Sequence, residues 1–389
     1  MDAIAGVMPE SQMNRSRCMA GKVVVYSLLL TMTSLLHASN SIDTKKVDAI
    51  LASAGLRSGN IPGAAVSVMH DGTVLYRRGY GFADLKTQHA IDWRTNFRLA
   101  SCTKQFTAMG IMLLVHDGKL KYDERLTDVF PDFPEYGNKI TIRMLLNHTS
   151  GLQDYEDLMA PEKYSEQQQI NDAGVLELMK HTSSTKFPPG SHWQYSNSGY
   201  VLLGLIVQKA SGESFPDFLH DRMFAPLGMT NTIAYVRGKN NLVNRAYGHS
   251  FENGTWKQTD QSPTSATLGD GGVYSSLQDL AKWDRALRDN TLLSRGEMQD
   301  ALTPVDVPGV KQPDAAPAQY GFGWFLNSYQ GHKRMWHYGE TMGFRTAIQR
   351  FTDDGLTIII LCNRADLNPT ALALQIADVY FSGAGKQDQ

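Results

Sequence analysis

The sequence has few cysteines and no pattern of metal ligands. Its 389 residues contain three cysteines, Cys18, Cys102 and Cys362, and no His-Glu-x-x-His or clustered Cys/His spacing. Cys102 and Cys362 lie in apolar stretches and are predicted to be buried free thiols rather than a disulfide. A Gly-x-Ser-x-Gly elbow and a Gly-x-Gly-x-x-Gly loop are also missing. We therefore expect neither a metal nor a cofactor.

The sequence also lacks an excess of charge of one sign. It has 37 lysines and arginines against 39 aspartates and glutamates, for a formal net charge of -2. A nucleic-acid partner is not expected from this balance. The hydrophobic share of 42% is that of an ordinary globular protein. We expect a small-molecule or peptide substrate, and the sequence leaves the oligomeric state open.

The apolar run near the N-terminus is shorter than the roughly 20 residues of a membrane-spanning helix. Residues 23–36 (VVVYSLLLTMTSLL) follow Arg15, Arg17 and Lys22 and precede the small residues at 38–39. This order is typical of a secretory signal peptide. We predict a signal peptide at residues 1–38 and a periplasmic or secreted protein, with no stable membrane span after cleavage. An uncleaved signal anchor is the alternative.

Two segments have the spacing Ser-x-x-Lys. Ser101 and Lys104 stand at the start of a segment, residues 106–113 (FTAMGIML), whose apolar spacing predicts an amphipathic helix. Residues three apart on a helix share a face, so Lys104 is placed to take the proton of a nucleophilic Ser101. Burial would lower the pKa of the lysine toward neutrality. The second copy, residues 183–186 (SSTK), runs into 187–190 (FPPG) and is predicted to be a loop.

A tyrosine and an asparagine precede a predicted helix at residues 200–210. They lie in the segment Tyr195-Ser196-Asn197. A tyrosine at such a place can carry protons to and from a leaving group. An asparagine amide can orient Lys104 or hold a substrate carbonyl. Both are candidate catalytic residues.

The segment His337-Tyr338-Gly339 ends a predicted strand. Glycine at the third position is expected to let a substrate approach the strand edge. The backbone N–H groups of Ser101 and Glu340 would then stabilise a tetrahedral oxyanion, with one such donor contributing about 3–4 kcal/mol. His337, Gly339 and Glu340 are therefore added to the candidate site.

The distribution of predicted elements indicates an α/β (α+β) fold in which both ends of the chain build one antiparallel sheet flanked by helices. A helix is expected at 42–56, a hairpin at 64–70 and 73–78 around Asp71-Gly72, and a helix at 172–180. Strands are expected at 321–328, 333–337, 345–351 and 356–362, before a closing helix at 369–380. We predict an α/β domain of residues 39–122 and 265–389, with a mainly helical domain, 123–264, inserted between them.

Together these motifs resemble the serine β-lactamase and penicillin-binding protein superfamily, in its class C-like branch. Three further segments resemble this superfamily: 145–152 (LLNHTSGL), 269–276 (GDGGVYSS) and 343–345 (GFR). The resemblance covers residues 42–380 as one catalytic unit and implies a β-lactamase/transpeptidase-like fold. We interpret residues 147–152 as a structural turn, with Gly151 in an unusual backbone conformation.

The resemblance also implies roles for the site residues. Ser101 would be acylated and then released by water, Lys104 and Tyr195 would share acid and base work, and Asn197 would position Lys104 and the substrate. His337 stands where many β-lactamases carry the lysine of Lys-Thr-Gly. Histidine is usual in peptidase-like and esterase-like members, so this departure counts against a dedicated β-lactamase.

Two residues near the third motif bear on the substrate. An ionised Glu340 about 5 Å from a substrate carboxylate would cost roughly 3 kcal/mol at an effective dielectric near 20. Alternatively, Glu340 points into the helix layer or pairs with Arg345 or His337, or Arg345 itself receives a carboxylate. We expect an exported serine hydrolase acting on an ester or amide, such as a D-amino acid peptide of the peptidoglycan type. The alternatives are a class C-like β-lactamase and a penicillin-binding sensor without turnover.

Overall fold

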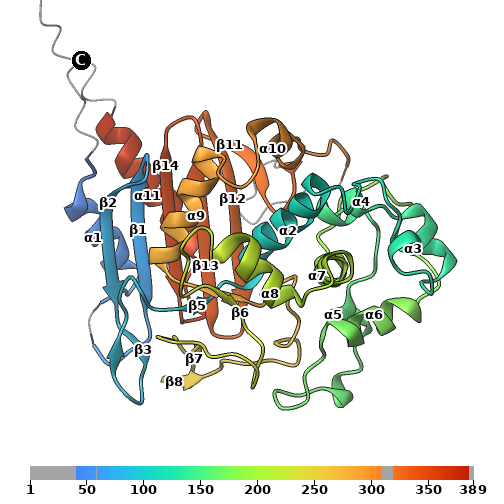
Figure 1. Cartoon of the computed structure of the whole chain (residues 1–389). Helices are drawn as coiled ribbons and strands as arrows, with labels where there is room; N and C mark the ends of the chain where they lie inside the picture. The colour runs from blue at the N-terminus through green and yellow to red at the C-terminus, as the bar shows by residue number, and fades with distance from the viewer. Residues whose placement is uncertain (1–40, 58, 309–318, 385–389) are drawn as a thin grey trace, which may run out of the picture. The chain divides into compact units, whose positions relative to one another are not determined.

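One seven-stranded antiparallel sheet forms the centre of the structure. The computed structural model describes residues 41–57, 59–308 and 319–384. The strand order is β10-β11-β12-β13-β14-β1-β2, so strands from the two ends of the chain lie side by side where β14 pairs with β1 (Figure 1). The strands are β1 (Ala64–His70), β2 (Thr73–Tyr80), β10 (Gln319–Tyr320), β11 (Phe325–Tyr329), β12 (His332–Thr341), β13 (Phe344–Phe351) and β14 (Leu356–Cys362). This sheet, built from both chain ends, confirms the predicted fold class.

The turn between β1 and β2 is the predicted one. Asp71 has a φ of 47° and Gly72 a φ of 76°. Two consecutive residues with positive φ are what a tight hairpin turn of the type I′ class requires, and Asp-Gly adopts them readily. The predicted hairpin is therefore confirmed, and β2 extends two residues beyond its predicted end.

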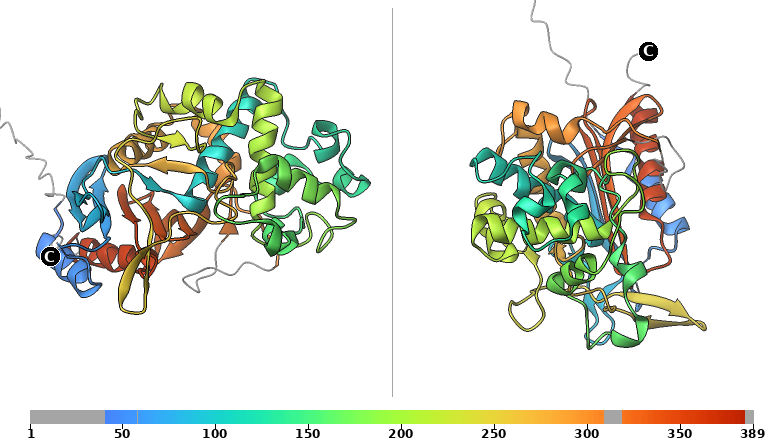
Figure 2. Two further views of the ribbon diagram at one scale, coloured as in Figure 1. Left: turned by 90° about the horizontal axis from the view of Figure 1, so that it is seen from below. Right: turned by 90° about the vertical axis from the view of Figure 1, so that its right-hand side faces the viewer.

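Helices cover both faces of the sheet (Figure 2). On one face, α1 (Thr44–Ser53) and α11 (Pro369–Ala384) bury apolar side chains against β1 and β14. On the other face lie α2 (Lys104–His116) and α9 (Leu277–Asp289), which belong to the larger apolar core, followed by α10 (Arg295–Leu302). Helix α1 is shorter at both ends than the expected helix at 42–56. The Asp43 side chain caps its start by accepting from the N–H of Lys46, and Gly55, with a φ of 78°, follows its end.

The prediction that α2 is amphipathic is wrong. Every residue from Lys104 to Leu114 is buried. The helix lies between the sheet and a second group of helices, with α7 (Asn197–Ser211) and α8 (Phe215–Leu219) packed against it. A helix enclosed on all sides shields its polar residues from water as well as its apolar ones, and this burial reaches Lys104.

The middle of the chain is mainly helical, as expected. The predicted helix at 172–180 matches α6, while α7 begins three residues earlier than predicted because the Ser196 side chain accepts from the Gly199 N–H. The division at residues 122 and 264 stays a prediction. The further helices are α3 (Leu126–Val129), α4 (Ile142–Leu146), α5 (Tyr155–Leu158) and α6 (Asp172–Lys180). The short strands are β3 (Phe82–Asp84), β4 (His89–Ala90), β5 (Phe97–Arg98), β6 (Ile233–Ala234), β7 (His249–Glu252), β8 (Thr255–Gln258) and β9 (Val273–Ser275).

Two strand predictions near the C-terminus need correction. The strand expected at 321–328 begins only at Phe325, because the chain first reverses between β10 and β11. Gly323 has a φ of 76°, and Gly321 N–H donates to the Trp324 carbonyl at 2.9 Å across this turn. The strand expected at 333–337 is twice as long in the structure, since β12 continues to Thr341. His337 therefore lies within the strand and not at its end.

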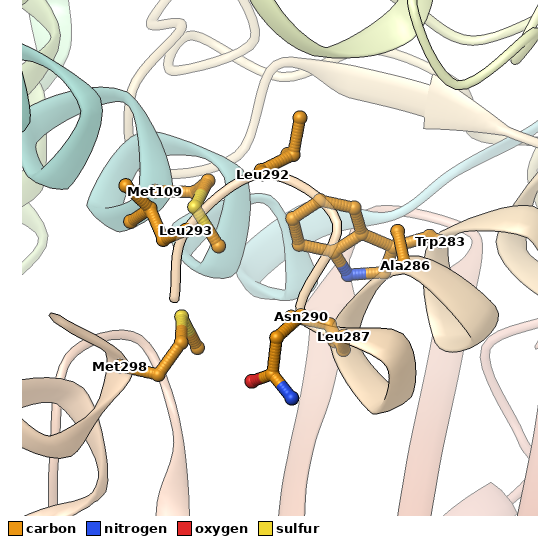
Figure 3. Close-up of a pocket in the computed structure, with 8 residues that line it drawn as sticks. All are labelled: Met109, Trp283, Ala286, Leu287, Asn290, Leu292, Leu293 and Met298. Carbon is orange, nitrogen blue, oxygen red and sulfur yellow. The ribbon is translucent and has the colours of Figure 1, made fainter. Parts of the chain in front are cut away.

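Two cavities lie away from Ser101. A small one of about 10 Å³ between α2, α9 and α10 has apolar walls formed mainly by Met109, Trp283 and Leu293 (Figure 3). A wide groove of about 940 Å³ lies between α9, α10 and the half of the sheet that holds Arg334 and Arg350. None of the residues predicted to form the active site lines either cavity.

The described residues contain no helix long and apolar enough to cross a membrane. Within the same ranges, no group of three or more histidine, cysteine or acidic side chains is arranged to hold a metal ion. Cys102 and Cys362 are buried free thiols, as predicted. The predicted signal peptide and Cys18 lie outside the described residues.

Candidate active site

The segment before Ser101 holds the serine at the start of a helix. Strand β5 leads into a single turn, η1 (Ala100–Thr103), which continues directly into α2. Ala100 has a φ of 48°, a conformation that L-residues other than glycine rarely adopt and that costs on the order of 1–3 kcal/mol. The Leu99 N–H donates to the Val273 carbonyl of β9 at 2.9 Å, which holds the strained turn in place. Ser101 is partly exposed at this turn.

Lys104 lies among three oxygen atoms. Its Nζ donates to Asn197 Oδ1 at 2.9 Å and to the backbone carbonyl of Asp270 at 3.0 Å, and it lies 3.2 Å from Ser101 Oγ. The amide oxygen and the carbonyl only accept, so they take both N–H groups of a neutral amine. The lone pair of that amine is left for the third neighbour, the Ser101 hydroxyl. This arrangement allows Lys104 to receive the proton of Ser101.

Because Lys104 is buried, a substantial fraction of it is neutral near physiological pH. The side chain is fully buried, and this burial lowers the pKa from 10.5 to about 8. The carboxylates of Asp270, Asp154 and Glu156 oppose the fall because each favours the charged amine. The shift is equivalent to about 3 kcal/mol. At pH 7 about one Lys104 in ten is neutral, against fewer than one in a thousand for an exposed lysine.

Helix α7 places Asn197 beside Lys104. Asn197 is its first residue, after the capping Ser196, and the Asn197 N–H donates to Asp154 Oδ2 at 2.9 Å. Asp154 in turn caps α5 by accepting from the Glu156 N–H at 3.1 Å. One carboxylate therefore joins the starts of two helices next to Lys104. The sequence reasoning did not identify Asp154.

Tyr195 precedes this cap and packs over Lys104. The Lys104 Nζ lies 4.7 Å from the centre of the Tyr195 ring. The Tyr195 hydroxyl is buried and makes no hydrogen bond within the described ranges. Burial raises the pKa of Tyr195 well above its ordinary value, and the nearby Ser101 hydroxyl opposes the rise. The unsatisfied hydroxyl is available to a substrate atom.

His148 belongs to the segment that the sequence analysis treated as structural. Gly151 has a φ of 70°, in agreement with the predicted turn, and His148 also has a positive φ, 62°. The buried His148 ring packs 4.4 Å from the Tyr195 ring, centre to centre, and its Nδ1 accepts from the Ser196 N–H at 3.2 Å. The turn therefore also positions the tyrosine of the site, which the sequence reasoning missed.

Asp270 is a further residue of the site that was missed. Its carbonyl accepts from Lys104, and its carboxylate Oδ2 accepts from the Tyr155 hydroxyl at 3.1 Å. The other carboxylate oxygen, Oδ1, is buried and has no partner among the described residues. The available signal was the segment 269–276, which resembles the family but contains no recognisable catalytic pattern.

His337 uses both ring nitrogens in this structure. Nδ1 donates to the Tyr338 carbonyl at 2.6 Å, since a carbonyl only accepts, and Nε2 accepts from the Tyr320 hydroxyl at 3.0 Å. Burial and the charge of Lys104 lower the pKa of His337 to about 3. The residue is therefore neutral and contributes no cation where a lysine stands in Lys-Thr-Gly.

The turn that holds Ser101, which we call the nucleophile turn, approaches β12 so closely that only glycine fits at position 339. A Cβ atom at this position would lie 2.0 Å from the Leu99 carbonyl oxygen and 3.3 Å from the Ala100 Cβ. The space is thus occupied by the chain just before Ser101, and not by a substrate as the sequence reasoning assumed. Beyond Trp336, β12 has no partner on the β11 side within the described residues. This free edge begins at His337 and passes Gly339.

Glu340 and Arg345 form a pair across β12 and β13. Arg345 Nη2 lies 2.9 Å from Glu340 Oε1, and its Nη1 donates to the carbonyls of Thr341 and Phe344. The Glu340 side chain is 59% exposed and that of Arg345 is 19% exposed. The predicted alternative of a Glu340–Arg345 pair is the one found.

A family model described as Beta-lactamase matches residues 45–380. The chain belongs to this family. Penicillin-binding protein 4* of Bacillus subtilis (strain 168) is 35% identical over 307 residues, which are 76% of this chain and 66% of that protein. A D-aminopeptidase from Brucella anthropi is 28% identical over 306 residues, which are 78% of this chain and 56% of that protein. The chain thus spans about 56–66% of the length of these relatives.

Solved structures agree with this assignment. The D-amino acid amidase from Ochrobactrum anthropi SV3 complexed with L-phenylalanine has a TM-score of 0.74 at 25% identity, covering 88% of this chain and 99% of that one. The octameric penicillin-binding protein homologue from Pyrococcus abyssi has a TM-score of 0.75 at 23% identity, covering 88% and 78%. The latter establishes the β-lactamase/transpeptidase-like fold alone. The chain is a serine hydrolase of the beta-lactamase family.

Proposed function

We propose that this hydrolase forms an acyl-enzyme on Ser101 and hydrolyses an amide or ester, with a D-amino acid amide or peptide as the preferred substrate class. The observation that carries the proposal is the surroundings of Lys104. Asn197 Oδ1 and the Asp270 carbonyl take the two N–H groups of the neutral amine, and Ser101 Oγ lies 3.2 Å from Lys104 Nζ. The relatives named D-aminopeptidase and D-amino acid amidase support the substrate class.

The proposed reaction has two acyl transfers. Neutral Lys104 takes the proton of Ser101, whose Oγ attacks the substrate carbonyl, and the N–H groups of Ser101 and Glu340 stabilise the oxyanion. Tyr195, whose hydroxyl has no partner within the described ranges, hands a proton to the leaving nitrogen or oxygen. Water then attacks the acyl-enzyme with the same groups in reverse order. His337, neutral and hydrogen-bonded on both nitrogens, acts as a positioning residue beside Tyr195.

A class C-like β-lactamase is the second candidate, supported by the match to the Beta-lactamase family model and by the relative named penicillin-binding protein 4*. The third is a sensor that is acylated once and does not turn over. The neutral His337 and the acidic Glu340 favour the amidase or esterase, because neither offers a cation to the carboxylate of a β-lactam.

We also propose export to the periplasm or the medium. The support is the basic segment and the apolar run at residues 15–36, followed by small residues. Expression of the full chain, followed by N-terminal sequencing of the mature protein from the periplasm, tests it. A new N-terminus close to residue 39 is expected, and an intact N-terminus in the cytoplasm would overturn it.

Intact-protein mass spectrometry tests the acyl-enzyme. Wild type and Ser101→Ala are incubated with p-nitrophenyl acetate and with benzylpenicillin, and drug consumption is followed in parallel. We expect ester hydrolysis that Ser101→Ala abolishes. A stable penicillin adduct on wild type alone indicates a penicillin-binding enzyme with slow deacylation, whereas consumed drug without an adduct favours the β-lactamase. Ester hydrolysis that survives in Ser101→Ala would refute the proposed nucleophile.

A further inference from the structure

The wide groove between α9, α10 and the central sheet has the size of a small-molecule binding site. Its volume is about 940 Å³, and such sites commonly measure about 300–1,000 Å³. Each helix turns one face toward it, because the lining residues are 284, 287 and 288 on α9 and 295, 298, 299 and 302 on α10. Strands β11 to β14 supply the rest of the wall. None of the proposed catalytic residues lines it.

A buried cation lies on the sheet side of the groove. The Arg350 side chain is only 10% exposed, and its Nε donates to Asp284 Oδ1 at 2.7 Å. Its Nη2 donates to the Asp284 carbonyl at 3.3 Å, while Nη1 contacts only the Met335 sulfur, at 3.5 Å. A thioether is a weak acceptor, so Nη1 lacks an oxygen partner within the described residues. A buried charged donor in this state is stabilised when a ligand supplies an acceptor.

A second guanidinium lies on the α9 wall, one turn beyond Asp284. The Nε of Arg288 donates to Asp289 Oδ1 at 3.0 Å, whereas its Nη1 is buried and has no partner in the described part of the chain. This group packs over the turn between β1 and β2, since a Cβ atom on Gly72 would lie 2.7 Å from Nη1. The pair with Asp289 therefore uses only the Nε of Arg288.

A third guanidinium belongs to the α10 wall. Arg295 is the exposed first residue of α10 and forms no ion pair within the described ranges. Met298 and Leu302 follow it on the same face of the helix, and Leu302 is 38% exposed. With Leu326 from β11, these two side chains give the groove an apolar strip. The groove thus combines cations with apolar surface.

Most of the acidic side chains that line the groove lie in two neighbouring turns. Asp71 is in the turn between β1 and β2, and Asp353 and Asp354 are in the turn between β13 and β14. Asp353 lies 3.0 Å from the Lys333 amine, and Asp354 lies 2.9 Å from the His332 ring. These acids are therefore grouped in one part of the groove, and two of them already have basic partners.

The two helix walls carry more positive than negative charge. Among the lining residues of α9 and α10, Arg288 and Arg295 stand against a single acid, Asp284. That acid is already paired with the buried Arg350. The space between the helices therefore favours an anion.

We propose that this groove is a second, non-catalytic binding site for a small anion with an apolar tail. Its carboxylate or phosphate head is held by Arg288, Arg295 and Arg350, because guanidinium donors match the paired oxygens of such a group. The tail lies along α10 toward Leu302, which is seven residues and about 10 Å beyond Arg295 at 1.5 Å per residue. The site does not depend on the reaction proposed at Ser101.

Isothermal titration calorimetry of Ser101→Ala tests the proposal, since this variant does not turn over the probes. The probes are hexanoate, hexyl phosphate, inorganic phosphate and uncharged hexanamide. We expect hexanoate or hexyl phosphate to bind with a Kd of about 1 mM or below, and the tighter of the two identifies the head group. Hexanamide and inorganic phosphate should each bind at least about tenfold more weakly, because one lacks the charge and the other the tail.

Three results would overturn the proposal at this step. If neither hexanoate nor hexyl phosphate binds at concentrations up to about 10 mM, the groove is not a site for such anions. If hexanamide binds as tightly as hexanoate, the charge is not recognised. If inorganic phosphate binds as tightly as the hexyl compounds, the apolar strip has no role.

Arginine variants in the Ser101→Ala background locate the site. Arg288→Gln and Arg295→Gln should each weaken binding of the preferred anion about tenfold. Arg350→Gln is unsuitable on its own, since it leaves Asp284 buried without its partner. Arg285→Gln is the matched control, because Arg285 is an exposed arginine of α9 that does not line the groove. An equal loss in this control would show that binding reports overall charge and would overturn the proposal.

Arg345→Gln distinguishes the groove from the active site. Arg345 pairs with Glu340 across β12 and β13 and does not line the groove. We expect this variant to bind the anion as Ser101→Ala does. Loss of binding in Arg345→Gln, with Arg288→Gln unaffected, would place the anion at the active site and overturn the proposal. Because no turnover is measured, a failure of the serine mechanism would leave these results unchanged.

Discussion

Replacing Asp270 by asparagine tests whether a carboxylate outside the sequence motifs sets the proton affinity of the base. The pKa of Lys104 is about 8 because burial lowers it while Asp270 and Asp154 oppose the fall. Only neutral Lys104 accepts the proton of Ser101. For a substrate with no titrating group, kcat/KM should therefore fall tenfold per pH unit below about 8 and be level above it.

The expected displacement follows from the interaction of two charges. Asp270 is the largest of the charges that raise the pKa of Lys104. Unit charges roughly 5–10 Å apart interact by about 2–3 kcal/mol at an effective dielectric near 20, which is more than one pKa unit. Asp270→Asn removes the group that favours charged Lys104, so the pKa of the lysine falls further. The acid limb of the pH–rate profile should move by about one unit to lower pH. At pH 7 the neutral fraction then rises from about one in ten to about one half.

The assay is the pH–rate profile of p-nitrophenyl acetate hydrolysis for wild type, Asp270→Asn and Tyr155→Phe. The last variant removes the hydroxyl that donates to Asp270 Oδ2 at 3.1 Å but keeps the charge. Its limb should stay within a few tenths of a unit of the wild-type position. Circular dichroism establishes that the variants are folded. A limb that stays in place or moves to higher pH in Asp270→Asn would refute the assignment of Lys104 as the base.

Three further changes test the backbone and the core. Gly339→Ala puts a methyl group where the Leu99 carbonyl oxygen lies 2.0 Å away, so the nucleophile turn must shift, and kcat/KM should fall about 100-fold with the protein still folded. Ala100→Gly relieves the strain of a positive φ. Replacing alanine by glycine ordinarily destabilises a folded protein, but here thermal unfolding should show no loss of stability, or a gain of up to about 1 kcal/mol. Asp284→Ala leaves Arg350, its partner at 2.7 Å, buried without an acid, and chemical denaturation should show a loss of about 3–5 kcal/mol.

The parts of the fold that could be predicted from the sequence are those with a local cause. Asp71-Gly72 specifies its hairpin through its own backbone preferences, and the inner strand β14 is a short run of β-branched and apolar residues. The extent of β12 was not predictable in this way, because its last residues are held by β13 alone. The amphipathic reading of α2 failed for a similar reason. Its polar side is covered by helices from distant parts of the chain.

The candidate site, too, could be predicted from the sequence only where neighbouring residues build it. Ser101 and Lys104 are three residues apart, so a helix alone brings them together. The two acceptors that orient Lys104 are 93 and 166 residues away in the chain. Nothing in a single sequence shows that Asp270 turns its carbonyl toward the lysine. The family resemblance marked the segment around Asp270 without indicating what it does.

The distance of these acceptors in the chain has a consequence for how the enzyme loses activity. Lys104 acts as a base only while it is buried and while Asn197 and Asp270 occupy both of its N–H groups. A small separation of α7 from α2 admits water, returns the pKa of the lysine toward 10.5 and withdraws Asn197, the acceptor that α7 carries. Secondary structure need not change for this to happen. Activity should therefore be lost at a lower denaturant concentration than the helical signal in circular dichroism at 222 nm. If the denaturation curves of activity and of circular dichroism coincide, the helices separate only on global unfolding.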